Sequence, residues 1–97
     1  MAKGMTFEQV EYDILNAQMY AQHIAREAIA ECALWLESGG DDAENAMYLN
    51  GRYLGKVSAL CWVLGYTTEF EYDADSCMAL RRYIESRADK LAKSRES

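Results

Sequence analysis

Apolar residues recur every three or four positions along most of the chain, which is the spacing of one face of an α-helix. The first such stretch begins after Thr6, which together with Gln9 matches the capping box that starts many helices. It stops at Gly39-Gly40, a helix terminator followed by a turn. Its apolar stripe consists of Phe7, Val10, Ile14, Ala17, Ala21, Ile24 and Ala28. The pattern predicts a long first helix over about residues 6–38.

A second line of side chains lies on another side of this predicted helix. It contains Tyr12, Leu15 and Met19, and then Arg26. The first helix is longer than the next one, so this line would overhang the bundle or pack on another subunit. We therefore expect self-association, as a homodimer.

A second helix is predicted over about residues 42–64. Asp41 and Glu44 have the capping-box spacing at its start, and Gly65 is expected to end it. Its last part, residues 57–64, is apolar nearly all round and should be central. The main stripe consists of Met47, Leu54, Val57, Cys61 and Leu64.

Small residues interrupt this second helix in a regular way. The stretch Gly51-Arg52-Tyr53-Leu54-Gly55-Lys56 superficially suggests a phosphate-binding loop. It has three residues between the glycines instead of four, and Val57 stands where a serine or threonine is needed. We expect Gly51, Gly55, Ser58 and Ala59 to form a face that packs against the alanines of the first helix. Backbone approach to a ligand is the alternative.

The stretch that follows alternates acids with aromatic residues, in Glu69-Phe70-Glu71-Tyr72. Alternation with period two formally suggests a strand, but four residues without a partner strand make a poor sheet. We predict an extended loop or a first helical turn, with Asp73 or Asp75 capping a third helix over about residues 74–94. The alternation is either cap chemistry with Phe70 tucked into the core, or an exposed edge made for a partner. The apolar side of the third helix consists of Met78, Leu80, Tyr83, Ile84, Ala88 and Leu91.

These elements indicate an all-α protein with one domain over residues 1–97. The absence of proline removes the strongest helix breaker. Short connections favour antiparallel neighbours, so an up-down-up three-helix bundle is expected. No apolar run is long enough to span a bilayer, and no signal peptide is evident. The odd number of cysteines, three without a paired spacing, favours a reducing compartment, and we expect the cytoplasm.

The net charge of −6 is unevenly distributed. Residues 1–75 carry 13 acids and four bases, a net −9, whereas residues 76–97 carry six bases and three acids, a net +3. An acidic body repels nucleic acid and attracts a basic protein surface. The bases of the third helix are interleaved with Glu85 and Asp89 at spacings that fit intrahelical ion pairs, so direct nucleic-acid binding is not expected.

The sequence gives little support for a metal site or for an enzyme active site. Cys32, Cys61, Cys77 and His23 have the residue types of a zinc site but not its spacing. Cys32 would lie at one end of the helical hairpin and the other two cysteines at the opposite end, so we interpret all three as small buried residues. His23 has no serine or cysteine nucleophile placed for a triad. We expect no enzyme, no metal and no cofactor.

The aromatic residues point to an interface. Seven tyrosines and two tryptophans are more than so small a core needs, and both residue types are favoured at protein interfaces. We predict a protein-interaction module, either an inhibitor or an adaptor, that binds a basic protein partner. One concrete form is occupation of a nucleic-acid-binding groove by carboxylates placed where phosphates would lie. The predicted partner-binding residues are Trp62, Tyr66, Glu69, Phe70, Glu71, Tyr72, Asp73 and Asp75.

A small-ligand binder is the alternative function. A nucleotide or another phosphorylated ligand would be held between subunits by the cations Arg26, Arg52 and Lys56, with tyrosines for stacking.

Overall fold

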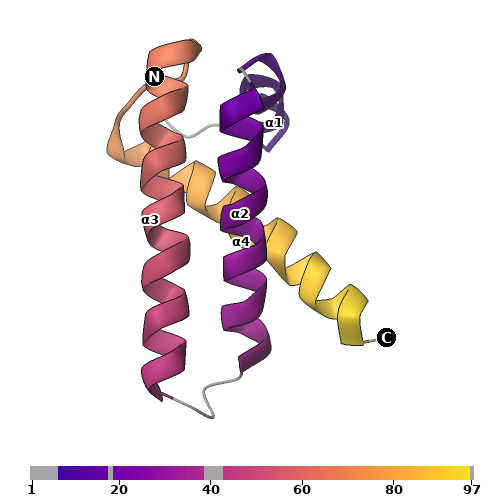
Figure 1. Cartoon of the computed structure of the whole chain (residues 1–97). Coiled ribbons are helices and arrows are strands. Elements are labelled where there is room, and N and C mark those ends of the chain that lie inside the picture. Colours follow the sequence, from indigo (N-terminus) through magenta and orange to yellow (C-terminus); the bar gives the residue numbers. More distant parts are fainter. Residues whose placement is uncertain (1–6, 18, 39–42, 97) are drawn as a thin grey trace.

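The described part of the chain is all-α and forms four helices (Figure 1). The computed structural model describes residues 7–17, 19–38 and 43–96. Helix α1 spans Phe7–Asn16, α2 Met19–Ser38, α3 Ala43–Thr67 and α4 Ala74–Glu96. No strand occurs in these ranges. The predicted class is confirmed, and the predicted count of three helices is wrong.

Helices α2 and α3 lie side by side and run in opposite directions (Figure 1). Helix α4 starts near the end of α3 and crosses behind α2 at an oblique angle, so that its C-terminus lies well to one side of the hairpin. Helix α1 lies beside the beginning of α2 and packs mainly on α4. Because α2 contacts all three other helices, it is the centre of the fold.

The predicted helix over residues 6–38 is divided into α1 and α2. The amide of Ala17 is shared between the carbonyls of Asp13 and Ile14, at 2.9 and 3.2 Å, as at many helix ends. The side chain of Asn16 donates to the carbonyl of Tyr12 at 2.8 Å, which satisfies a carbonyl that a continuing helix would have used. The division lets α1 turn and bury Val10 and Ile14 against the other helices.

Of the apolar stripe predicted for the first helix, Val10, Ile14 and Ala17 are buried before this division and Ala21, Ile24 and Ala28 after it. The side chain of Phe7 lies outside what the structure describes. The buried face of α2 is made mainly of alanine, with Ala21, Ala25, Ala28 and Ala33 beside Ile24 and Cys32. Larger side chains from α3 and α4 complete the core, including Tyr53, Leu60, Leu64, Leu80 and Ile84. Alanine on the central helix leaves room for these larger neighbours, which explains why α2 can pack against two helices at once.

Helix α3 continues through Gly65, so the prediction that this glycine ends the helix is wrong. The hydroxyls of Thr67 and Thr68 donate to the carbonyls of Val63 and Leu64, each at 2.8 Å, in the last turn of the helix. The Leu64 carbonyl also accepts from the amide of Thr68 at 3.0 Å. The Thr68 hydroxyl also accepts from the amide of Phe70 at 3.0 Å. Two threonines, rather than a left-handed glycine, therefore end the helix.

The small residues of α3 face outward, contrary to the prediction that they pack on the alanines of α2. Gly51, Gly55, Ser58 and Ala59 are all exposed, and a Cβ atom built at either glycine would meet no atom within 4 Å. The opposite face of α3, with Tyr53, Val57 and Leu60, fills the core instead. These larger side chains bury more apolar area than glycine and alanine would, and they determine which face turns inward.

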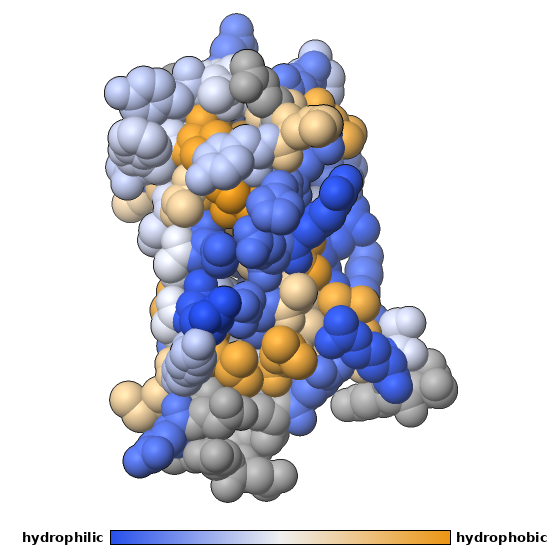
Figure 2. Space-filling view, in the orientation of Figure 1, coloured by the Kyte–Doolittle hydropathy of each residue, from blue (hydrophilic) through white to orange (hydrophobic). Residues whose placement is uncertain are grey.

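Ion pairs cover the seam between α2 and α3 on the face shown in Figure 2, where hydrophilic side chains cross the middle of the molecule. Arg52 pairs with Glu31 at 2.9 Å, and Lys56 pairs with Glu27 at 3.4 Å. The bases of α4 likewise pair with their own helix or with the body, in Arg81–Glu85, Lys93–Asp89, Arg87–Glu11 and Arg95–Glu37. The basic C-terminal helix is therefore largely neutralised within the chain.

Tyr53 connects α3 to α4 by a hydrogen bond at the edge of the core and to α2 by ring stacking. The hydroxyl of the fully buried Tyr53 donates to Glu85 at 2.9 Å, and Arg81 donates to the same carboxylate oxygen at 2.9 Å. Trp35 of α2 stacks on Tyr53 with a ring-centroid distance of 5.4 Å. Burial, and then the bond to Glu85, raises the pKa of Tyr53 to about 12, so the phenol stays a neutral donor.

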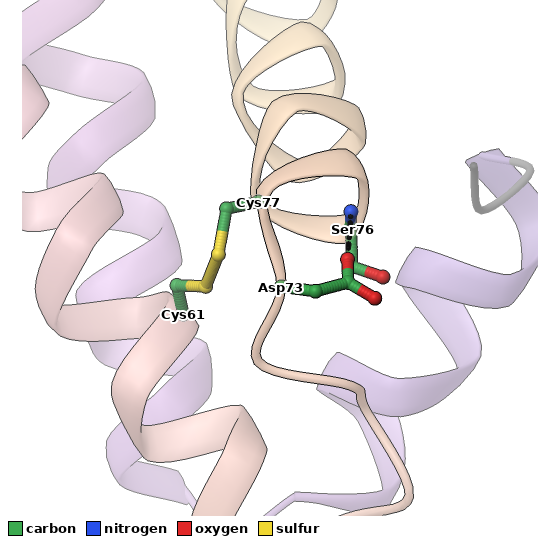
Figure 3. The surroundings of a disulfide bond; sticks show 4 residues. All are labelled: Cys61, Asp73, Ser76 and Cys77. Atoms are coloured by element: carbon green, nitrogen blue, oxygen red, sulfur yellow. Dashed lines mark hydrogen bonds between the residues drawn. A yellow bond between two sulfur atoms is a disulfide. The ribbon is translucent and has the colours of Figure 1, made fainter. Parts of the chain in front are cut away.

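Two of the three cysteines form a disulfide, which corrects their interpretation as separate buried thiols. Cys61 of α3 and Cys77 of α4 are joined across a Cα–Cα distance of 6.0 Å (Figure 3). Their placement at the same end of the hairpin was predicted, but their bonding was not. The argument from cysteine spacing for a reducing compartment therefore no longer holds. Cys32 remains a free, buried thiol, and burial raises its pKa to about 11.

Within the described residues, none of the helices has the length and apolar character that crossing a bilayer requires.

Breaking the disulfide is expected to destabilise the fold. The bond closes a loop of sequence separation 16, for which the loss of chain entropy in the unfolded state corresponds to about 3 kcal/mol. Reductant should lower the free energy of unfolding of the wild type by about this amount in urea titrations. The variant Cys61→Ala/Cys77→Ala should start at the lower value and should not respond to reductant. Equal unfolding of the wild type with and without reductant would contradict the prediction.

Candidate functional site

The exposed aromatic side chains predicted to bind a partner gather at the end of α3. Trp62 and Tyr66 lie one turn apart with ring centroids 4.8 Å from each other. Tyr72 comes back from the loop and lies over Gly65, where an added Cβ would stand 3.4 Å from the Tyr72 Cβ. Trp62, Gly65, Tyr66 and Tyr72 together line a surface hollow of about 260 Å³. A Cβ at Gly65 would thus be in van der Waals contact with Tyr72, and a side chain larger than alanine would meet it.

Acidic residues lie close to Tyr72 in the sequence, on the segment between α3 and α4 and in the first turn of α4. Glu69, Glu71 and Asp75 are exposed. Asp73 has a structural role, because its carboxylate accepts from the amide of Ser76 at 2.7 Å and caps α4 (Figure 3). Of the two predicted capping residues, Asp73 is thus the one that caps. From residue 57 to residue 80 the chain carries four acids and no base.

Phe70 is the one predicted partner-binding residue that the structure removes from the surface. Its side chain is only 4% exposed and belongs to the core cluster. The segment after α3 is irregular, and Phe70 points inward between the exposed Glu69 and Glu71. The inward phenyl ring anchors the loop, so Phe70 positions the site and does not contact a partner.

Helix α1 adds a further acid to this end of the molecule. Burial, and then the negative charge of Glu69, raises the pKa of Asp13 above its usual range. The two carboxylates therefore repel each other across the junction of α1 with the loop. This repulsion is an electrostatic cost that a nearby positive charge would relieve.

The loop that carries the site is fixed at both ends. The disulfide joins Cys61, which precedes Trp62, to Cys77, which follows Asp75 and Ser76. All the predicted partner-binding residues lie between these two cysteines. The threonine caps of α3, the Asp73 cap of α4 and the buried Phe70 restrain the segment between them. The site is therefore pre-organised, which reduces the entropy lost on binding.

The three cations predicted for the alternative ligand site do not form one site. Gly51, Arg52, Gly55, Lys56 and Ala59 line an open hollow on α3, and Arg26 is not among its lining residues. Both of its cations pair with acids of α2, at Glu31 and Glu27. These two carboxylates neutralise both cations of the hollow. An anionic ligand would therefore have to compete with them.

No metal site is evident in the part of the chain that the structure describes, since no three histidine, cysteine, aspartate or glutamate residues are grouped to hold an ion there. His23 is exposed and lies 3.1 Å from Glu27, one turn away on α2.

Two features of the site were not predicted from the sequence. One is the disulfide, whose only signal was that Cys61 and Cys77 flank the same predicted connection. The other is Gly65 as the floor of an aromatic hollow. No sequence pattern distinguishes a glycine that ends a helix from one on which a later tyrosine packs.

Neutralising Asp13 is expected to stabilise the protein at neutral pH. The pKa of Asp13 is higher in the folded than in the unfolded protein, where it is about 3.9. Wild-type stability therefore falls as the pH rises through this window and stays low above it. Asp13→Asn should unfold at higher urea concentration than the wild type at pH 7, and the difference should shrink toward pH 4. Asp75→Asn is the control, because it removes an exposed acid that favours the first turn of α4 and should not stabilise.

Comparison with protein-family models, with curated proteins and with solved structures finds no match to this chain. Its function must therefore be argued from its own surface.

Proposed function

We propose that this protein is a non-enzymatic interaction module that binds a basic surface of another protein through residues 62–75. The observation that carries the proposal is the exposure of Trp62, Tyr66 and Tyr72 around one hollow within an acidic segment restrained at both ends. Aromatic anchors supply contact area at low entropic cost, and the acids supply charge complementarity.

The specific form that we propose is an inhibitor or adaptor that occupies a nucleic-acid-binding groove. Exposed carboxylates on a restrained loop resemble a short run of phosphates in charge, and they meet lysine and arginine side chains in the same way. The ion pairs of α4 support this direction, because four of its six bases are paired with acids of the same chain, namely Arg81, Arg87, Lys93 and Arg95.

The proposal is tested by capture from a lysate of the native host with paired variants. Glu69→Gln/Glu71→Gln removes two acids of the site, and Glu44→Gln/Asp89→Asn removes the same charge elsewhere. The wild type and the second variant should retain the same basic protein. Added duplex DNA should release it by competition, and salt at about 0.5 M should release it because salt screens exposed charges. The first variant should retain at least about fivefold less, which corresponds to 1 kcal/mol. Equal retention by both variants, or capture that ignores salt, would contradict the proposal.

Self-association is a separate proposal, supported by a second exposed surface. Tyr12, Leu15, Met19 and Tyr20 flank the junction of α1 and α2, and Met19 is 81% exposed. Tyr12, Leu15 and Met19 belong to the second line of side chains predicted from the sequence, and the structure adds Tyr20. Exposed apolar residues clustered on one side of a small protein are typical of contacts with another subunit.

We expect the wild type to be a dimer by light scattering at micromolar concentrations, and Leu15→Glu/Met19→Glu to be a monomer. Burying two carboxylates in an apolar interface costs several kcal/mol, enough to dissociate it. Met47→Glu places a charge at a similarly exposed methionine on α3 and should leave the dimer intact. A wild type that is monomeric at all concentrations would refute the dimer.

A further inference from the structure

The hollow at the end of α3 has three aromatic walls and a glycine floor. Trp62 is 56% exposed and Tyr66 77% exposed, and their rings meet at an interplanar angle of 46°. Tyr72 closes the hollow from the loop, held above Gly65. An occupant of this space would contact aromatic side chains from both α3 and the loop.

The faces of tryptophan and tyrosine rings carry negative charge density and attract cations. Two cations of this chain already use such faces. Arg52 lies over the ring of Tyr48 with 5.3 Å between its guanidinium carbon and the ring centroid, and Arg87 lies over Tyr83 at 5.5 Å. Among the described residues no such contact is formed with the three rings of the hollow. The nearest bases in the sequence are Lys56, paired with Glu27, and Arg81, paired with Glu85.

The charge around the hollow favours the same kind of occupant. Glu69, Glu71 and Asp75 are exposed on the segment that follows it, and Asp13 faces Glu69 from α1. An apolar side chain would pack against the rings but would not be attracted by these acids. A cation would use both, because it would lie against aromatic faces while the carboxylates lower its electrostatic energy.

We propose that the hollow formed by Trp62, Gly65, Tyr66 and Tyr72 is the seat of an arginine side chain from the basic protein partner. This inference rests on the proposed function and names the group by which the partner is recognised. Arginine fits better than lysine, because its planar, weakly hydrated guanidinium stacks on aromatic rings and still donates to carboxylates at its edge. The acids attract a basic surface in general, and the hollow selects one arginine on it.

Synthetic peptides separate these two roles. The probes are three hexapeptides of arginine, lysine and citrulline, the last being uncharged and close to arginine in shape. Affinity is measured from the fluorescence anisotropy of labelled peptides, which can be applied to every variant. Contact with the hollow is followed in the wild type by the NMR signals of the Trp62 indole, assigned with Trp62→Phe. The arginine peptide should bind at least fivefold more tightly than the lysine peptide and should shift the Trp62 signal, while the citrulline peptide should not bind measurably.

Variants test the hollow itself. Trp62→Ala should weaken arginine-peptide binding about fivefold or more and leave lysine-peptide binding within a factor of two. Gly65→Val should weaken it as well, because the added side chain meets Tyr72 and displaces it from the hollow. Tyr48→Ala is the matched control, because Tyr48 is similarly exposed on the same helix, about 21 Å away along its axis. Circular dichroism confirms that each variant is folded.

The outcomes distinguish this inference from the proposed function. Equal affinity for the arginine and lysine peptides, unchanged by Trp62→Ala but weakened by Glu69→Gln/Glu71→Gln, would overturn the arginine seat and leave an acidic binding surface. Absence of binding by either charged peptide would overturn the arginine seat, and failure to capture a basic protein would overturn the proposed function separately. A shift of the Trp62 signal by the arginine peptide alone, together with weaker binding of that peptide to Trp62→Ala and unchanged binding to Tyr48→Ala, would establish the seat.

Discussion

Close packing of α2 against two helices at once is the constraint on which the rest of the structure depends. Its buried face is made largely of alanine, so the neighbouring helices supply the bulk of the core from their own side chains. This arrangement puts Tyr53, Leu60 and Leu64 inward on α3 and turns Gly51, Gly55 and Ala59 outward. A larger residue at a position such as Ala28 would overfill a space with no exposed outlet.

A core of this size cannot enclose all the aromatic residues of the chain. Tyr53 and Phe70 are taken inside, where the first finds a hydrogen-bond partner in Glu85 and the second needs none. Trp62, Tyr66 and Tyr72 remain outside, and the position of Gly65 brings them around one space. The exposure of these rings follows from packing inside the molecule. It creates the surface on which the proposed partner binding and the proposed arginine seat both depend.

Charge and covalent structure act on this surface together. The bases of α4 are drawn onto acids of its own helix and of the body, as in Arg87–Glu11 and Arg95–Glu37. The segment between the two half-cystines contains four acids and no lysine or arginine. Because the disulfide holds that segment, its carboxylates and rings stay close together in spite of their repulsion. A flexible acidic loop would lose more entropy on binding and discriminate less between partners.

The sequence by itself determined the helical class, the start of α4 at about residue 74 with Asp73 or Asp75 as its cap, the outward line through Tyr12, Leu15 and Met19, and the acidic, aromatic character of residues 62–75. Each of these follows from local spacing, capping chemistry or composition. Tertiary structure decided the division of the first helix, because the choice between a straight and a bent path depends on what Val10 and Ile14 can pack against. It also decided which face of α3 is buried, whether Cys61 meets Cys77, and whether Phe70 or Tyr72 turns inward. These outcomes depend on contacts between distant segments, whose competing burial energies are not contained in any local pattern.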